Sequence, residues 1–211
     1  MRERLTFERY LVGVRRAYLT VALAPPELSS PASDGAIAAL EMAVGHALPV
    51  GLRKAWLLAN GQGITPDAPL FWETEADDDG RLVGYDFMSV AQAGVAHAGY
   101  AARAPSFDEG PEPRDEEIAA GSFLPGWLPF ADFGSGSMQL MIDFTPSPSG
   151  TLGQVIAVTR DPDGVRWVAS SFDTFLATSF AALASDPDYV LQEVNQDGSI
   201  AGRRERRDDR E

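Results

Sequence analysis

The acidic side chains between residues 75 and 86 are the first feature of this chain whose type and spacing could do chemistry. Glu75, Asp77, Asp79 and Asp86 fall at positions 1, 3, 5 and 12 of a calcium-binding loop. The first ligand is Glu where Asp is usual, the last is the short Asp, and Pro69 upstream disfavours the helix that enters such a loop. We therefore interpret the segment as an acidic hairpin turn. Calcium binding is the alternative, and a calcium titration would separate the two.

Side chains for nucleophilic or metal-dependent catalysis are scarce. The chain has no cysteine, and its two histidines, His46 and His97, lack the spacing of a metal motif, so we interpret both as surface or helix-capping residues. The glycine-rich run around Ser135 and Ser137 lacks the pattern of a phosphate-binding loop or a hydrolase elbow. We predict no cofactor, no metal ion and no catalytic residues, and hence no enzyme. A hydrolase that uses carboxylates is the alternative, and it would need two close carboxyl groups of raised pKa in a cleft.

Charge is distributed unevenly along the chain. The 211 residues carry a formal net charge of −14, and residues 17–202 alone hold 7 basic and 25 acidic side chains, a net charge of −18. Nucleic-acid binding requires Lys and Arg to replace condensed counterions, so the composition argues against direct DNA or RNA binding. An acidic surface instead attracts a cationic protein. We predict a partner-binding site made of two acidic clusters, whose members are Asp77, Asp78, Asp79, Asp108, Glu109, Glu112, Asp115, Glu116 and Glu117.

Apolar periodicity predicts the elements that must position these residues. Helical spacing indicates helices at residues 7–18, 34–44, 49–59, 89–102 and 172–183. Aromatic and β-branched runs indicate strands at residues 70–74, 82–87, 138–144, 155–158 and 165–169. Trp72 and Trp127 lie in apolar segments, and we interpret them as core residues. The arrangement predicts an α+β fold with an antiparallel meander flanked by helices.

The chain is predicted to form one domain with a segment at each end. We assign residues 1–26 to an N-terminal amphipathic helix packed on the domain, residues 27–185 to the domain, and residues 186–211 to a charged C-terminal tail that is partly disordered. Residues 105–121 are rich in proline, glycine and acidic side chains, so we expect an exposed or mobile loop. The sequence leaves the oligomeric state open.

No apolar run reaches the length of a membrane span. Residues 17–24 resemble the apolar core of a secretion signal, but Glu3 and Glu8 in the preceding segment argue against that interpretation. We therefore expect no membrane association and a cytoplasmic location.

Three blocks of sequence in a fixed order carry a resemblance to a known family. Their residues are Leu40-Glu41, Gly45, Leu48-Pro49, Leu52-Arg53 and Asn60-Gly61; then Phe123 to Asp132, Gly134 to Gly136 and Ile142-Asp143; then Gly153 to Ile156, Val168 to Phe172 and Phe175-Leu176. Together they resemble the SUKH superfamily, the Smi/Knr family named after a yeast regulator of cell-wall assembly. The resemblance spans roughly residues 30–185 and rests on the order and spacing of all three blocks.

The resemblance implies a curved antiparallel sheet flanked by helices, acting as a protein-binding module. Many bacterial members are similar to immunity proteins that neutralise toxin domains, often nucleases, while fungal members regulate cell-wall synthesis. We therefore predict a non-enzymatic immunity protein that binds and neutralises a bacterial toxin, with a regulatory scaffold as the alternative. The residues that choose the partner are expected outside the three blocks.

Overall fold

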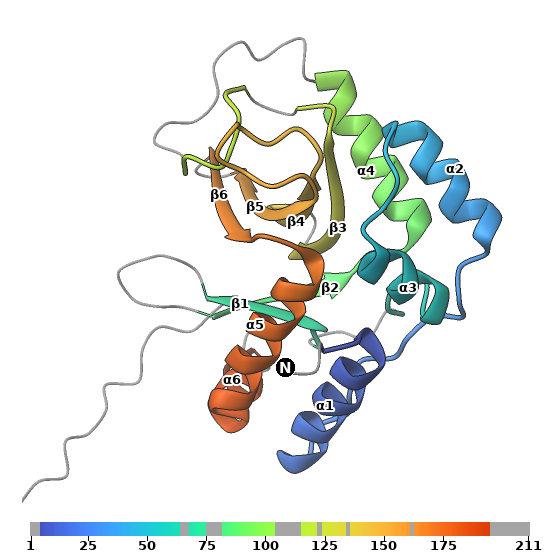
Figure 1. Cartoon of the computed structure of the whole chain (residues 1–211). Coiled ribbons are helices and arrows are strands. Elements are labelled where there is room, and N and C mark those ends of the chain that lie inside the picture. Colours follow the sequence, from blue (N-terminus) through green and yellow to red (C-terminus); the bar gives the residue numbers. More distant parts are fainter. Residues whose placement is uncertain are drawn as a thin grey trace, which may run out of the picture.

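The first half of the chain is mostly helical and the second half supplies most of the sheet (Figure 1). The computed structural model describes residues 5–63, 68–74, 82–103, 115–121, 124–133, 136–160 and 163–194. Its helices are α1 (Phe7–Thr20), α2 (Asp34–Val44), α3 (Val50–Leu58), α4 (Val90–Arg103), α5 (Phe172–Ser185) and α6 (Pro187–Val194). Its strands are β1 (Phe71–Thr74), β2 (Leu82–Phe87), β3 (Trp127–Phe133), β4 (Met138–Asp143), β5 (Gln154–Arg160) and β6 (Asp163–Ala169).

The strands form one antiparallel sheet in which each strand pairs with its neighbour in sequence, from β1 to β6. The register shifts in β3 between Pro129 and Ala131, and in the β5–β6 pair between Val155 and Ile156. Such bulges bend a strand and increase its twist, so the sheet curls. The predicted α+β fold with a curved antiparallel meander is confirmed.

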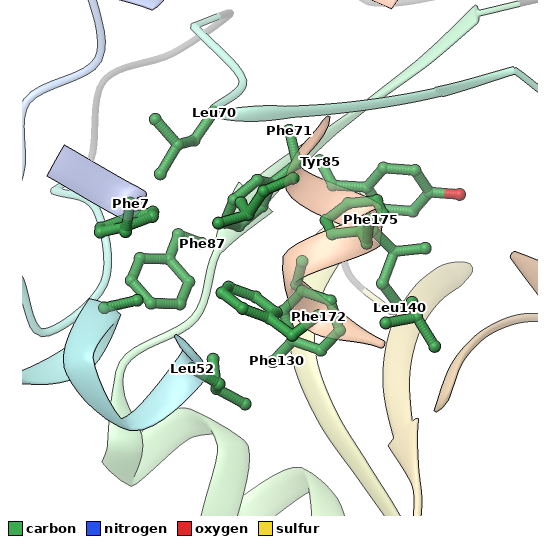
Figure 2. Close-up of a cluster of buried hydrophobic side chains, with 14 of the residues drawn as sticks. Phe7, Leu52, Leu70, Phe71, Tyr85, Phe87, Phe130, Leu140, Phe172 and Phe175 are labelled. Carbon is green, nitrogen blue, oxygen red and sulfur yellow. The ribbon is translucent and has the colours of Figure 1, made fainter. Parts of the chain in front are cut away.

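Helix α5 packs on one face of the curled sheet, against both β1 and β6. Its buried Phe172 and Phe175 contact Phe71 of β1 and Phe130 of β3, with ring centroids 5.5 to 6.4 Å apart (Figure 2). Phe71 also contacts Phe130 and three rings from α1 and β2, which are Phe7, Tyr10 and Phe87. Ring packing at this fully buried side chain therefore joins two helices and three strands.

Hydrogen bonds fix α1 against β1 and α5. Tyr10 Oη donates to Leu70 O at 2.6 Å and lies 2.8 Å from Ser179 Oγ, which in turn accepts from Trp72 N at 2.8 Å. Since the tyrosine proton goes to Leu70 O, the Ser179 hydroxyl donates to Tyr10 Oη. Burial raises the pKa of Tyr10, so it stays a neutral donor. The amphipathic N-terminal helix is thus bound to the domain by polar as well as apolar contacts.

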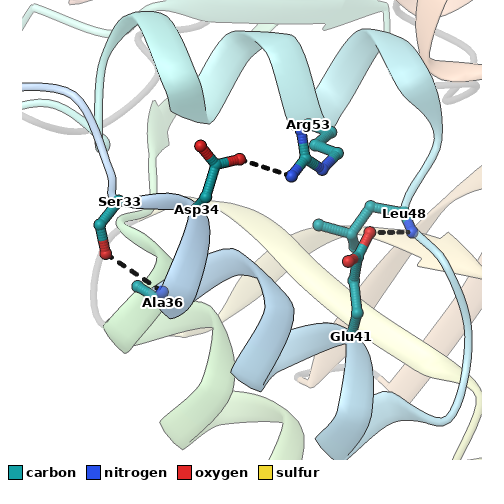
Figure 3. A network of polar contacts seen from close by, with 6 residues as sticks. All are labelled: Ser33, Asp34, Ala36, Glu41, Leu48 and Arg53. Carbon is teal, nitrogen blue, oxygen red and sulfur yellow. Dashed lines mark hydrogen bonds and ion pairs between the residues drawn. The ribbon is translucent and has the colours of Figure 1, made fainter.

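The α2–α3 pair carries the first block of the family resemblance. Ser33 caps α2, and Glu41 Oε1 accepts a hydrogen bond from Leu48 N at 3.0 Å where the chain turns between the helices (Figure 3). Arg53 of α3 pairs with Asp34 of α2 at 2.6 Å on the surface. The predicted helical pair is confirmed, and the Glu41 side chain stabilises the turn between the two helices.

Asn60 and Gly61 join α3 to the start of α4. Asn60 Oδ1 accepts a hydrogen bond from Val90 N at 2.9 Å, which caps α4. Gly61 has a φ of 81°, and a Cβ at this position would lie 2.5 Å from Ser89 N. Only glycine therefore combines this backbone conformation with so close an approach of two chain segments.

The other face of the sheet carries a second apolar cluster. Met141 belongs to it while Leu140 lies in the main core, because neighbouring residues of a strand point to opposite faces. Tyr100 of α4 and Ile118 of the segment 115–121 cover this second cluster. Both faces of the sheet are therefore packed.

Two elements differ from the sequence prediction. Strand β3 was not assigned, although its residues lie in the second block of the resemblance. Helix α6 lies in the segment assigned to the tail, yet Val190 and Leu191 are buried in the main core. The packed part of the chain therefore extends beyond residue 185.

We predict that Arg166→Ala destabilises the fold by about 3 kcal/mol, because Arg166 of β6 pairs with Glu73 of β1 and Glu73 is only 6% exposed. Arg53→Ala is the control, since it breaks a pair of the same type whose side chains are 37% and 78% exposed, and it should cost about 0.5 kcal/mol. Urea unfolding measures both losses. Equal losses would contradict a structural role for the Glu73–Arg166 pair.

Candidate partner-binding surface

The segment 115–121 holds the described members of the second acidic cluster. Asp115 and Glu116 are exposed and Glu117 is half-buried. The backbone here is held by hydrogen bonds that Glu116 O accepts from Ser147 Oγ and that Glu117 O accepts from Gln154 Nε2 at 2.9 Å. These side chains therefore stand on a fixed backbone at the end of the loop that we expected to be exposed or mobile, and residues 105–114 of that loop lie outside the described residues.

The buried side chain of Ile118 anchors the same segment to the sheet. It is 4% exposed and packs with Tyr100 and Trp127 in the second apolar cluster. Its amide donates to Asp115 O at 3.1 Å, which closes a turn. Apolar burial thus fixes a turn on which the Asp115 and Glu116 side chains are exposed, and a fixed turn loses little conformational entropy when a partner binds.

Neighbouring residues of strand β6 make polar contacts with two other segments, β1 and residues 115–121. Arg166 pairs with Glu73, which lies in the strand that leads into the first cluster. Trp167 N donates to Asp115 Oδ2 at 2.5 Å, in the second cluster. Strand β6 therefore contacts both β1 and residues 115–121 through adjacent residues, and residues 75–81 of the first cluster lie outside the described residues.

The Glu73 carboxylate is held from two sides. Arg166 contacts its Oε1, and Tyr85 Oη donates to its Oε2 at 3.0 Å. Glu73 and Phe71 are two residues apart in β1, so both point to the core-facing side of the strand. The sequence indicated an acidic hairpin here, but no local pattern predicted that Arg166 of β6 would pair with Glu73.

The structure describes three of the nine predicted site residues. Three lie in the anchored turn, which are Asp115, Glu116 and Glu117. The other six lie outside the described residues, and their assignment stays a prediction: Asp77, Asp78, Asp79, Asp108, Glu109 and Glu112. Asp115 has a structural contact as well, since its carboxylate accepts the hydrogen bond from Trp167 N.

The calcium interpretation is disfavoured by the strand upstream of the loop. Phe71–Thr74 pairs with β2 as a hairpin, with Thr74 opposite Leu82, where a calcium-binding helix pair needs a helix. Asp86 lies within β2 and accepts a hydrogen bond from Gln62 Nε2 at 2.7 Å. Within the described ranges, no group of three or more His, Asp or Glu side chains could hold a metal ion.

The histidine and tryptophan interpretations have mixed outcomes. His97 was expected to be a surface or helix-capping residue, which is wrong, because it lies inside α4 and is 7% exposed, with Nε2 2.8 Å from Pro125 O. His46 is half-buried beyond the end of α2, where its ring stacks on Phe144 at 4.9 Å. Trp72 and Trp127 are each 1% exposed, so their assignment to the core is confirmed.

Two carboxyl groups have raised pKa values, and they do not form a pair. Burial raises the pKa of Asp132 and of Asp143, although hydrogen bonds to each lower it in part. Asp132 lies opposite Gln139, four residues before Asp143 in β4, so the two carboxyl groups stand roughly 13 Å apart along the ladder. Their separation does not fit paired-carboxylate hydrolysis.

Each of these carboxyl groups accepts hydrogen bonds that stabilise the fold. Asp143 accepts from Thr145 N at 2.8 Å and from Gln154 Nε2 at 3.0 Å. Asp132 accepts from Gln139 Nε2 at 3.0 Å and from Gly136 N at 3.1 Å. Both therefore hold the turns at the ends of the sheet.

These features define an α+β domain that offers an anchored acidic turn. No helix in the described part of the chain is long and apolar enough to cross a membrane. The chain belongs to the SMI1/KNR4 family (SUKH-1), whose sequence profile matches residues 31–178. It is similar to the cell wall biosynthesis/cell cycle regulator smi1 of Schizosaccharomyces pombe, with 31% identity over 148 residues. The alignment covers 65% of this chain and 28% of that protein.

We predict that acid stabilises the wild-type protein relative to Asp143→Asn. A raised pKa in the folded state means that the contribution of Asp143 is complete below its ordinary pKa and is lost as pH rises through the folded-state value. The unfolding free energy of the wild type minus that of the variant should therefore increase as pH falls from 7 towards 4. Urea unfolding across this range measures the difference. A constant difference, or one that decreases, would contradict the assignment.

Proposed function

We propose that this chain is a non-enzymatic immunity protein that binds a cationic toxin domain and neutralises it by covering its surface. Membership of the SMI1/KNR4 family supports a protein-binding domain. The observation that carries the proposal is the anchored turn at residues 115–121, where exposed Asp115 and Glu116 stand on a backbone held by Ser147 and Gln154. We propose that Asp77, Asp78 and Asp79, which lie outside the described residues, belong to the same acidic surface.

Electrostatics explains how such a surface would work. Residues 17–202 carry a net charge of −18, which attracts a cationic protein at long range and raises its association rate. Carboxylates on a fixed backbone can also occupy a site that normally binds substrate phosphates. A toxin that acts on nucleic acid has such a site, so we propose a nuclease as the toxin. We propose a cytoplasmic location, because an immunity protein must meet its toxin in the cell that makes both.

A pull-down from the source organism, followed by mass spectrometry, tests the proposal directly. We expect it to capture a toxin domain encoded next to this gene. Co-expression of the chain with that domain should restore growth of a sensitive host. Capture of housekeeping proteins alone, with no rescue of growth, would contradict the immunity role.

We predict that Glu116→Gln/Glu117→Gln lowers the association rate constant several-fold at low ionic strength and changes the dissociation rate constant little. Glu8→Gln/Asp34→Asn removes the same number of charges from exposed positions on other elements and serves as the control. Stopped-flow or surface plasmon resonance at several salt concentrations measures both constants. The wild-type association rate should fall as salt rises. Equal effects of the two double variants would contradict the placement of the site.

A regulatory scaffold is the second candidate, and the similarity to the fission-yeast regulator favours it. The chain spans 28% of that protein, so the comparison concerns one region of a longer regulator. Gene context separates the candidates, because an adjacent multidomain toxin gene supports immunity and a housekeeping operon supports regulation.

A further inference from the structure

A groove of about 520 Å³ lies between α1 and the α5–α6 corner, where Figure 1 shows these helices side by side. Val12 and Arg16 line its α1 side, and Phe180 and Pro187 line the opposite side. The helices approach closely because α1 has Gly13 at the contact, where a Cβ would lie 2.4 Å from the Phe180 ring. The groove is therefore lined mainly by apolar side chains, and it lies where the two helices pack closely together.

The charges at this groove are opposite in sign to those of the chain as a whole. Among the side chains that the structure describes, the charged ones that line it are Arg9 and Arg16, both exposed, and none of those lining it is acidic. A second groove of about 370 Å³ lies on the other flank of α1, and its charged lining residue is Arg15. Val12 is 70% exposed and lines both grooves. A protein of net charge −14 therefore presents a basic and apolar ridge on α1, which consists of Arg9, Val12 and Arg16.

We propose that this ridge binds an acidic amphipathic helix of a protein partner. Arg9 and Arg16 are seven residues apart on α1, about 10.5 Å along the helix axis, which matches acidic residues at positions i and i+7 of a docking helix. Apolar residues at i+3 and i+4 of that helix would contact Val12 and Phe180. The charges of the two helices are complementary, so the pairing selects acidic partners over the basic partner proposed for the other surface.

The ridge lies on an element outside the segment that defines the family. Helix α1 precedes the matched residues 31–178, and α6 follows them. The proposed surface is thus an addition to the SUKH domain, and it is distinct from the acidic turn at residues 115–121.

The exposed side of α1 does not suit a lipid surface. An interfacial helix buries a broad apolar face in the bilayer. The apolar face of α1 is already in the protein core, with Phe7, Tyr10 and Val14 buried. Its outer side exposes Val12 and Leu19 among charged residues, which favours a helical partner with carboxylates.

The probe is a fluorescent helical peptide with Glu at i and i+7, Leu at i+3 and i+4, and Ala or Gln elsewhere. We expect fluorescence anisotropy with the full chain to show saturable binding. Arg16→Glu and Val12→Glu should each raise Kd about tenfold, and Arg16→Glu should instead bind a peptide in which Lys replaces only the Glu that faces residue 16. Lys54→Glu, an exposed site on α3, makes the same charge change as Arg16→Glu and should leave Kd unchanged. Circular dichroism melting confirms that each variant is folded.

Three results would overturn the proposal. The Lys54→Glu control could weaken binding as much as Arg16→Glu, which would indicate a response to net charge alone. The Gln version of the peptide could bind as tightly as the Glu version. Phosphatidylserine vesicles could bind the chain through Arg16 while the peptide does not, which would identify the ridge as a lipid contact.

Discussion

The structure depends on the packing of one aromatic ring, Phe71, at the start of the sheet. Its ring meets aromatic side chains from α1, β2, β3 and α5, so the first strand must lie where both helices meet the sheet. Two residues further along the same face, Glu73 then reaches Arg166 of the last strand. A hydrophobic contact thus sets the geometry of a buried ion pair, and the ion pair joins the two ends of the curled sheet.

The same geometry relates fold to function. Arg166 is tied to the segment that leads into the first acidic cluster, and the next residue, Trp167, donates its backbone hydrogen bond to Asp115 of the second. The packing of the core therefore fixes the position of β6 and of the segments bonded to it, while α1 carries the basic ridge elsewhere on the domain. The proposed acidic surface and the proposed basic ridge would let one domain bind two partners of opposite charge.

Local patterns in the sequence predicted most of the elements, and long-range contacts account for what it missed. Ser33 and Gly45 indicated the ends of α2 because their capping roles are local, whereas the hydrogen bond from Val90 N to Asn60 joins residues far apart in sequence. Strand β3 was missed because Pro129 disfavours a strand interior, and it is accommodated by a register shift. The acidic composition around Asp115 suggested a site, but its contact with Trp167 depends on how the sheet curls.

Amide hydrogen exchange of the chain, free and bound to its cationic partner, tests the central claim that the surface around β6 binds that partner. The account predicts slower exchange in residues 75–81, 104–121 and the edge of β6, with α2 and α3 unchanged. Protection confined to α2 and α3, with the acidic segments exchanging as fast as in the free chain, would contradict it.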